Sequence, residues 1–166
     1  ALAALGLPSA QPFILVVFHP VVQQAGLAHA QTRALMAALQ PQGCPVLWLE
    51  PNADAGALGV LQALDESPLP PGSRRVAHLD RALFAQAMRH AAVMVGNSSS
   101  GIIEAASFGT PVINIGDRQR LRERNANTVD VPTETQALGT ALQQALARER
   151  HPGHNRYGDG LVPRPC

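Results

Sequence analysis

The sequence contains no lysine and few aromatic residues or cysteines. Its 13 arginines oppose 12 acidic residues and leave a formal net charge of +1. This balance argues against nucleic acid or a membrane surface as a partner, because both select a basic face or block. Six residues are aromatic and 27 are alanine, so the core is predicted to be aliphatic, with alanine-lined helices.

Long hydrophobic runs are also absent. The longest apolar run, residues 12–18, is shorter than the roughly 18–20 residues that span a bilayer. Residues 1–7 are apolar but lack the basic start and cleavage pattern of a signal peptide, which favours a cytoplasmic location. Cys44 and Cys166 are too few for a disulfide scaffold or a zinc site, and no metal or cofactor is expected. Cys44 is interpreted as a small core residue.

Short β-rich runs alternate with helical patterns, which is typical of βα units around a parallel sheet. We therefore expect an α/β fold, with a Rossmann-like parallel sheet of about six strands flanked by helices. The predicted domain covers residues 12–150, between a linker or helix end at 1–11 and an irregular tail at 151–166. Because the chain starts at Ala1 without a methionine, we interpret it as part of a longer protein. The strands are predicted at 12–19, 45–49, 74–79, 91–95, 110–115 and 129–131. The helices are predicted at 25–40, 54–64, from the cap Asp80 to about 90, from the turn at 96–101 to about 108, and from the cap Thr133 to 150.

Four chemistry-bearing stretches lie at the carboxyl ends of predicted strands. They are His19, the turn at 80–84, the segment 96–104 and the loop at 116–118. In an open parallel sheet, ligands bind beyond the carboxyl ends of the strands, where helix N-termini also point. The sequence therefore predicts that these four stretches converge.

The segment 96–104 is the most informative of the four. It carries three consecutive serines, Ser98, Ser99 and Ser100, between glycines at a predicted helix start. Serine hydroxyl groups, free backbone N–H groups and the positive end of a helix dipole together suit a phosphate. A serine-rich helix cap without a ligand is the alternative. The pattern matches neither a Walker loop, nor a dinucleotide fingerprint, nor the nucleophile elbow of hydrolases.

Four other side chains are candidates at the same edge. Glu104 can accept hydrogen bonds from a ribose diol, or can be a solvated acid favoured by the helix dipole. Arg118 can clamp a diphosphate, or can belong to a solvated basic loop. His19 can donate to a phosphate or act as an acid or base, or can be structural. Phe84 can stack on a nucleobase, or can pack in the core.

The blocks GNSSSGIIEA at 96–105 and FGTPVINIGDRQ at 108–119 resemble the C-terminal nucleotide-binding domain of the UDP-N-acetylglucosamine 2-epimerases, in their hydrolysing branch. FHPV at 18–21 and NRYGDG at 155–160 resemble two further elements of that family. The T-D-S-G-G turn of the non-hydrolysing branch is absent. Two glutamines at 23–24 depart from the family pattern, and the chain after residue 160 does not continue into the family's final helix.

The resemblance implies the C-terminal half of a GT-B two-domain architecture, with the sugar nucleotide held between two Rossmann-like halves. Such enzymes eliminate UDP from UDP-N-acetylglucosamine or a UDP-diacetamido sugar. They then add water to the glycal, which releases a 2-epimeric free sugar such as N-acetylmannosamine for nonulosonic acid or surface-polysaccharide synthesis. The acid and base carboxylates belong to the N-terminal half, which is missing here. This chain alone is therefore expected to be inactive, and the full-length parent is expected to be a homo-oligomer.

The resemblance also assigns roles to the residues at the strand ends. The serines at 98–100 are expected at the UDP diphosphate, Glu104 at the ribose hydroxyls, Arg118 at the nucleotide and Phe84 beside the uracil. His19 is the expected catalytic residue, near the diphosphate. Two alternatives stay open: a GT-B glycosyltransferase that holds its nucleotide in the same way, and a non-catalytic nucleotide-binding module.

Overall fold

The computed structural model shows one sheet of six parallel strands. The strand order is β3-β2-β1-β4-β5-β6, which confirms the predicted Rossmann-like α/β fold. The structure describes residues 12–19, 26–51, 56–97, 104–115 and 128–147. The strands are β1 (Ile14–Val17), β2 (Val46–Leu49), β3 (Arg74–Val76), β4 (Val93–Gly96), β5 (Val112–Ile115) and β6 (Thr128–Val131).

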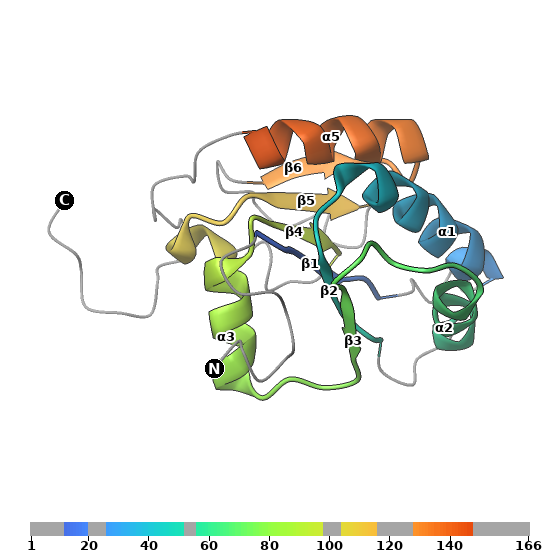
Figure 1. The fold of residues 1–166 in the computed structure, drawn as a ribbon, viewed down its shortest axis with the longest axis horizontal. Helices are drawn as coiled ribbons and strands as arrows, with labels where there is room; N and C mark the ends of the chain where they lie inside the picture. The colour runs from blue at the N-terminus through green and yellow to red at the C-terminus, as the bar shows by residue number, and fades with distance from the viewer. Residues whose placement is uncertain (1–11, 20–25, 52–55, 98–103, 116–127, 148–166) are drawn as a thin grey trace, which may run out of the picture.

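Helices cover both faces of this sheet (Figure 1). On one face, α1 (Ala28–Leu39) packs between α2 (Ala57–Glu66) and α5 (Thr135–Ala147). On the other face, α3 (Arg81–His90) lies beside the 3-10 helix η4 (Ala105–Phe108). A second 3-10 helix, η3 (Gln40–Gln42), continues the end of α1.

The central strands are apolar because both of their faces meet helices. Every residue of β1 and β4 is buried. Alternate side chains of β1 enter two separate cores: Ile14 and Val16 face α1, α2 and α5, whereas Leu15 and Val17 face α3. We call these the first and the second core cluster. The alternation follows from the period of two residues in a strand.

Several element ends differ from the sequence prediction. β1 is shorter than the predicted 12–19, and β3 ends at Val76 instead of residue 79. β3 lies at the edge of the sheet and pairs only with β2, so it ends where β2 ends, at the pair Leu49 and Val76. The second helix begins at Ala57 rather than at residue 54, after Gly56 with its positive φ of 90°.

The helix predicted to run from the turn at 96–101 to residue 108 is only partly described. Residues 98–103 lie outside the described part of the chain. Glu104 occupies a turn, and residues 105–108 form the 3-10 helix η4 instead of an α-helix. Contrary to the prediction, Glu104 therefore does not lie within an α-helix that reaches residue 108. Gly109, with a φ of 70°, ends η4 after four residues.

Candidate functional site

The strand order changes direction between β1 and β4. From β1 the chain proceeds outward through β2 to β3, and from β4 it proceeds the opposite way through β5 to β6. β1 and β4 are paired in parallel, with Val17 opposite Gly96 at their carboxyl ends. Helices on opposite faces leave a crevice at such a switch point, which is where ligands of open α/β sheets bind.

Gly96 brings the two strand ends unusually close together. Its φ is 146°, and a Cβ built at this position would lie 1.9 Å from the carbonyl oxygen of Val17. No side chain fits at that distance, so only glycine allows this approach of β4 to β1. The backbone N–H of the next residue, Asn97, donates to the same Val17 carbonyl over 3.2 Å.

Asn97 then extends the contact to His19. Its Oδ1 accepts a hydrogen bond from the His19 backbone N–H at 2.8 Å, and its Nδ2 donates to the His19 carbonyl oxygen at 2.6 Å. The Asn97 side chain is buried, with 1% exposure, whereas His19 is half-buried. The ends of β1 and β4 are thus joined through one side-chain amide, and His19 lies beside the residue that precedes the serines at 98–100.

Two other predicted site residues lie within the described part. Phe84 is in the first turn of α3, where its backbone N–H donates to the Asp80 carbonyl over 2.9 Å. Its ring is half-buried and packs against the second core cluster. Glu104 is exposed, and its carbonyl oxygen accepts from Ser107 N–H at 3.1 Å. The predicted UDP-contacting residues Ser98, Ser99, Ser100 and Arg118 lie outside the described residues, and their roles stay predictions.

A polar pair that the sequence reasoning missed lies on β5 and β6. The Nδ2 of Asn114 donates to Oδ1 of Asp130 at 2.8 Å, and Asn114 is 1% exposed. In the sheet register Asn114 is the neighbour of both Gly96 and Asp130. A buried asparagine within the apolar run VINI is the signal that could have indicated it, because a buried amide needs a partner. The polar side chains at the carboxyl end of the sheet therefore continue from Asn97, which follows β4, through Asn114 on β5 to Asp130 on β6.

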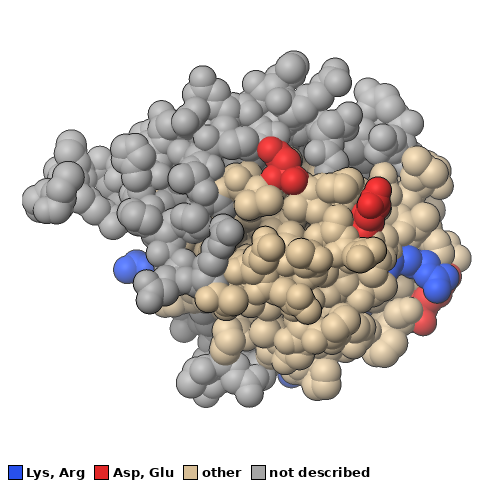
Figure 2. Space-filling view, turned by 90° about the horizontal axis from the view of Figure 1, so that it is seen from above, with Lys and Arg blue, Asp and Glu red and all other residues tan. Residues whose placement is uncertain are grey.

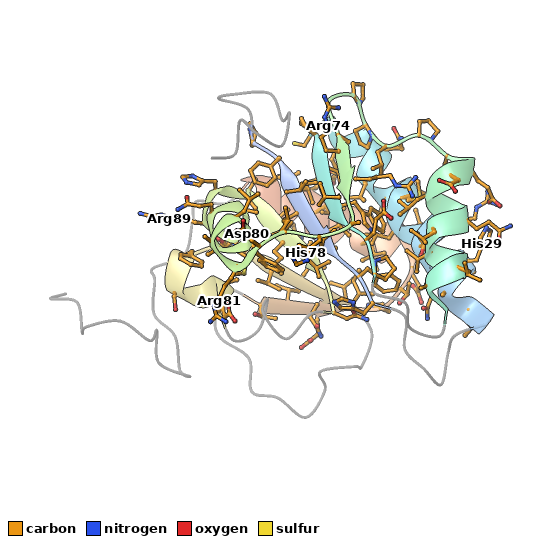
Figure 3. The ribbon with its side chains drawn as sticks, turned by 90° about the horizontal axis from the view of Figure 1, so that it is seen from below. His29, Arg74, His78, Asp80, Arg81 and Arg89 are labelled. Atoms are coloured by element: carbon orange, nitrogen blue, oxygen red, sulfur yellow. The ribbon has the colours of Figure 1, made fainter. Side chains whose placement is uncertain are left out.

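His29 on α1 contacts Glu66 on α2. His29 Nε2 and Glu66 Oε2 lie 2.8 Å apart, and Arg33 Nη1 is 3.7 Å from the same oxygen, which links α1 to α2 at the surface. Figure 3 shows His29 well separated from His78 and Asp80, which lie along the stretch leading into α3.

The helical face over α1 and α5 offers little charge for an anionic ligand. α5 contains no charged residue, and the described surface in Figure 2 shows few charged side chains.

Cys44 is half-buried against the first core cluster, and burial raises the pKa of its thiol. Within the described residues, no three His, Cys, Asp or Glu side chains gather as a metal site requires. None of the described helices is long and apolar enough to cross a membrane.

Comparisons with known proteins show the family and the fold. The family model for UDP-N-acetylglucosamine 2-epimerase matches residues 4–164. A UDP-N,N'-diacetylbacillosamine 2-epimerase (hydrolyzing) from Legionella pneumophila is 39% identical over 152 residues, which cover 92% of this chain and 40% of the relative.

Two solved structures share the fold. The UDP-GlcNAc 2-epimerase from Neisseria meningitidis bound to UDP-GlcNAc superposes with a TM-score of 0.69 at 14% identity, over 93% of this chain and 43% of that one. The calicheamicin glycosyltransferase CalG4 superposes with a TM-score of 0.58 at 16% identity, over 85% and 35% of the two chains. The chain thus spans about two fifths of the curated relative's length.

Proposed function

Because this chain belongs to the UDP-N-acetylglucosamine 2-epimerase family, we propose that it forms the UDP-binding half of a hydrolysing 2-epimerase. The observation that carries the proposal is the junction at the switch point of the sheet, where Asn97 joins His19 to the strand that leads into the serines at 98–100. The proposed substrate is UDP-N-acetylglucosamine or a UDP-diacetamido sugar. The relative from Legionella, which acts on the latter kind of sugar, supports this choice.

The proposed binding mode follows the order of chemical groups in UDP. The diphosphate lies at the serines of 98–100 and at His19, with Arg118 as a further cationic partner. Glu104 accepts hydrogen bonds from the ribose hydroxyls, and its exposure leaves its carboxylate open to a ligand. Phe84 lies beside the uracil. These assignments rest on the motif positions and on the common edge at which the strands end.

In the proposed reaction, this chain binds the UDP group and a second Rossmann-like half supplies the base. A base removes the proton from C2 of the sugar, the bond from C1 to the diphosphate oxygen breaks, and UDP leaves. Water then supplies a hydroxyl group to C1 of the resulting glycal while C2 regains a proton from the opposite face. Hydrogen-bond donors and cations at the diphosphate stabilise the negative charge that develops as UDP leaves. The base is proposed to belong to a second Rossmann-like half outside this sequence, so this chain alone binds UDP without turnover.

Calorimetric titration of the chain with UDP, uridine and inorganic diphosphate tests the proposal. We expect UDP to bind more tightly than either part. Glu104→Gln is expected to weaken UDP and uridine by about tenfold, because it removes a charged hydrogen-bond acceptor, and to leave inorganic diphosphate unchanged. Glu66→Gln is the matched control, since Glu66 ends α2 and pairs with His29 at the surface. Absence of UDP binding by the folded chain, or equal losses for UDP and diphosphate in Glu104→Gln, would contradict the proposed site.

A glycosyltransferase is the second candidate, and the likeness in fold to CalG4 favours it. The two functions differ in their need for an acceptor. A hydrolysing epimerase releases free 2-epimeric sugar and UDP from the nucleotide sugar and water alone, whereas a glycosyltransferase requires an acceptor molecule. Incubating a full-length protein that contains this chain with a UDP-sugar and no acceptor, and identifying the released sugar by NMR, distinguishes them.

A further inference from the structure

The Asn97 side chain forms hydrogen bonds with both backbone polar groups of His19, which lies just past the end of β1. Its amide bonds the N–H and the C=O of His19, at 2.8 Å and 2.6 Å, while its own N–H bonds the carbonyl of Val17. The amide therefore continues the parallel ladder between β1 and β4 past the last backbone pair, Val17 and Gly96.

We propose that Asn97 is a positioning residue that fixes the direction of the His19 side chain toward the ligand. The backbone N–H and C=O lie on either side of the Cα, so bonding both restrains φ and ψ of His19. Once these angles are fixed, the Cα–Cβ bond has one direction relative to β4. The inference rests on the proposed function, in which the His19 imidazole meets the UDP diphosphate, and it adds the residue that sets the direction in which the His19 side chain leaves the backbone.

Asparagine is the residue type whose side chain fits both hydrogen bonds to His19. The contact needs one acceptor and one donor on a planar group, and the asparagine amide has both. An aspartate has nearly the same shape, but its carboxylate cannot donate to the His19 carbonyl and would place two acceptors against each other. A serine is too short to bond both atoms. Because Asn97 is 1% exposed, bulk water cannot replace a lost bond at no cost.

A ligand-free experiment tests the positioning directly. NMR spectra of Asn97→Ser and Asn97→Asp are compared with the original chain and with Thr110→Val. Thr110 is a matched control, because its buried hydroxyl donates to the Met88 carbonyl at 2.6 Å, at the amino end of β5. We expect the His19 amide to exchange with solvent at least about tenfold faster in Asn97→Ser. We also expect the His19 ring signals to move toward those of a mobile histidine in both Asn97 variants, and to stay unchanged in Thr110→Val.

A double-mutant cycle tests whether Asn97 acts through His19. UDP, uridine and inorganic diphosphate are titrated into Asn97→Ser, His19→Gln and the double variant. We expect Asn97→Ser to weaken UDP and diphosphate by about fivefold to tenfold, in the range of one lost charge-assisted contact, and to leave uridine unchanged. In the His19→Gln background the same substitution is expected to have little further effect, since coupled residues are not additive. A general loss of packing would not discriminate between uridine and diphosphate.

The outcomes separate this inference from the proposed function. If the original chain binds no UDP, the proposed function fails, and the His19 amide and ring signals still decide whether Asn97 positions His19. Unchanged His19 signals in both Asn97 variants would overturn the positioning role even where UDP binds. Fully additive losses in the cycle would overturn it as well. If Asn97→Asp does not fold, Asn97→Ser, which introduces no charge, carries the same comparison.

Discussion

The contact between Gly96 and Val17 fixes the geometry of the candidate site at the scale of single residues. A Cβ on Gly96 would collide with the Val17 carbonyl, and Asn97 reaches His19 only because the two strand ends lie this close. In the sequence, Gly96 and Asn97 stand out only as the start of the serine segment. Their effect on His19, which lies 78 residues earlier, depends on the pairing of β1 with β4 and has no local signal.

Gly96→Ala is expected to lower the free energy of unfolding by at least about 3 kcal/mol. Both the positive φ and the 1.9 Å contact oppose a side chain at this position, and each effect costs on the order of 1–3 kcal/mol. Gly139→Ala is the control, because a Cβ there meets nothing within 4 Å and Gly139 lies inside α5. That change is expected to stabilise the protein by up to about 1 kcal/mol. Urea unfolding measures both, and equal stability of the two variants would contradict the steric argument.

At the scale of elements, helix α3 follows the sequence rules closely. Asp80 has extended backbone angles, and its Oδ1 accepts from Leu83 N–H at 2.8 Å, as expected of an N-cap. The segment 105–108 differs from the prediction in its form, because it is the 3-10 helix η4 instead of an α-helix, although it ends at residue 108 as predicted. Caps can be predicted because they are local, whereas the form of a short segment between two strands depends on where the strands lie.

Asp80→Ala is expected to cost about 1 kcal/mol of stability, the usual value for the loss of a capping side chain. Asp80→Asn keeps an oxygen at the same position and is expected to stay within a few tenths of a kcal/mol of the original chain. The difference between the two variants in urea unfolding isolates the hydrogen bond to Leu83. A loss of the same size in both would show that the charge of Asp80, rather than its capping bond, stabilises α3.

At the scale of the whole molecule, the first core cluster joins helices to the five strands from β2 to β6 in the sheet order. It includes Trp48 on β2 and Leu138 on α5, both fully buried, together with residues of β1, β4, β5 and β6. Trp48 is the only tryptophan of the chain, and its indole N–H is buried without a hydrogen-bond partner. Its fluorescence therefore reports on one end of a core whose other end lies beneath α5.

Leu138→Ala is expected to cost about 2–5 kcal/mol, because it removes a fully buried side chain and leaves a cavity. Leu58→Ala on α2 is the control, since Leu58 is 83% exposed and little burial is lost there. If the core unfolds as one unit, Trp48 fluorescence and far-UV circular dichroism shift together in Leu138→Ala. A fluorescence midpoint that stays at its original value while dichroism shifts would show that the two ends of the sheet unfold separately.

The sequence by itself determined the α/β class, the six strands, the Asp80 cap and the resemblance to the epimerase family. These depend on local patterns: apolar runs, turn residues and motif blocks that lie together in the chain. Only the tertiary structure decided the strand order, the approach of Gly96 to Val17, the hold of Asn97 on His19 and the pair of Asn114 with Asp130. The reason is physical. These contacts join residues on neighbouring strands or just past their ends, and those residues are far apart in the sequence. Which strands become neighbours depends on how the helices pack on both faces of the sheet.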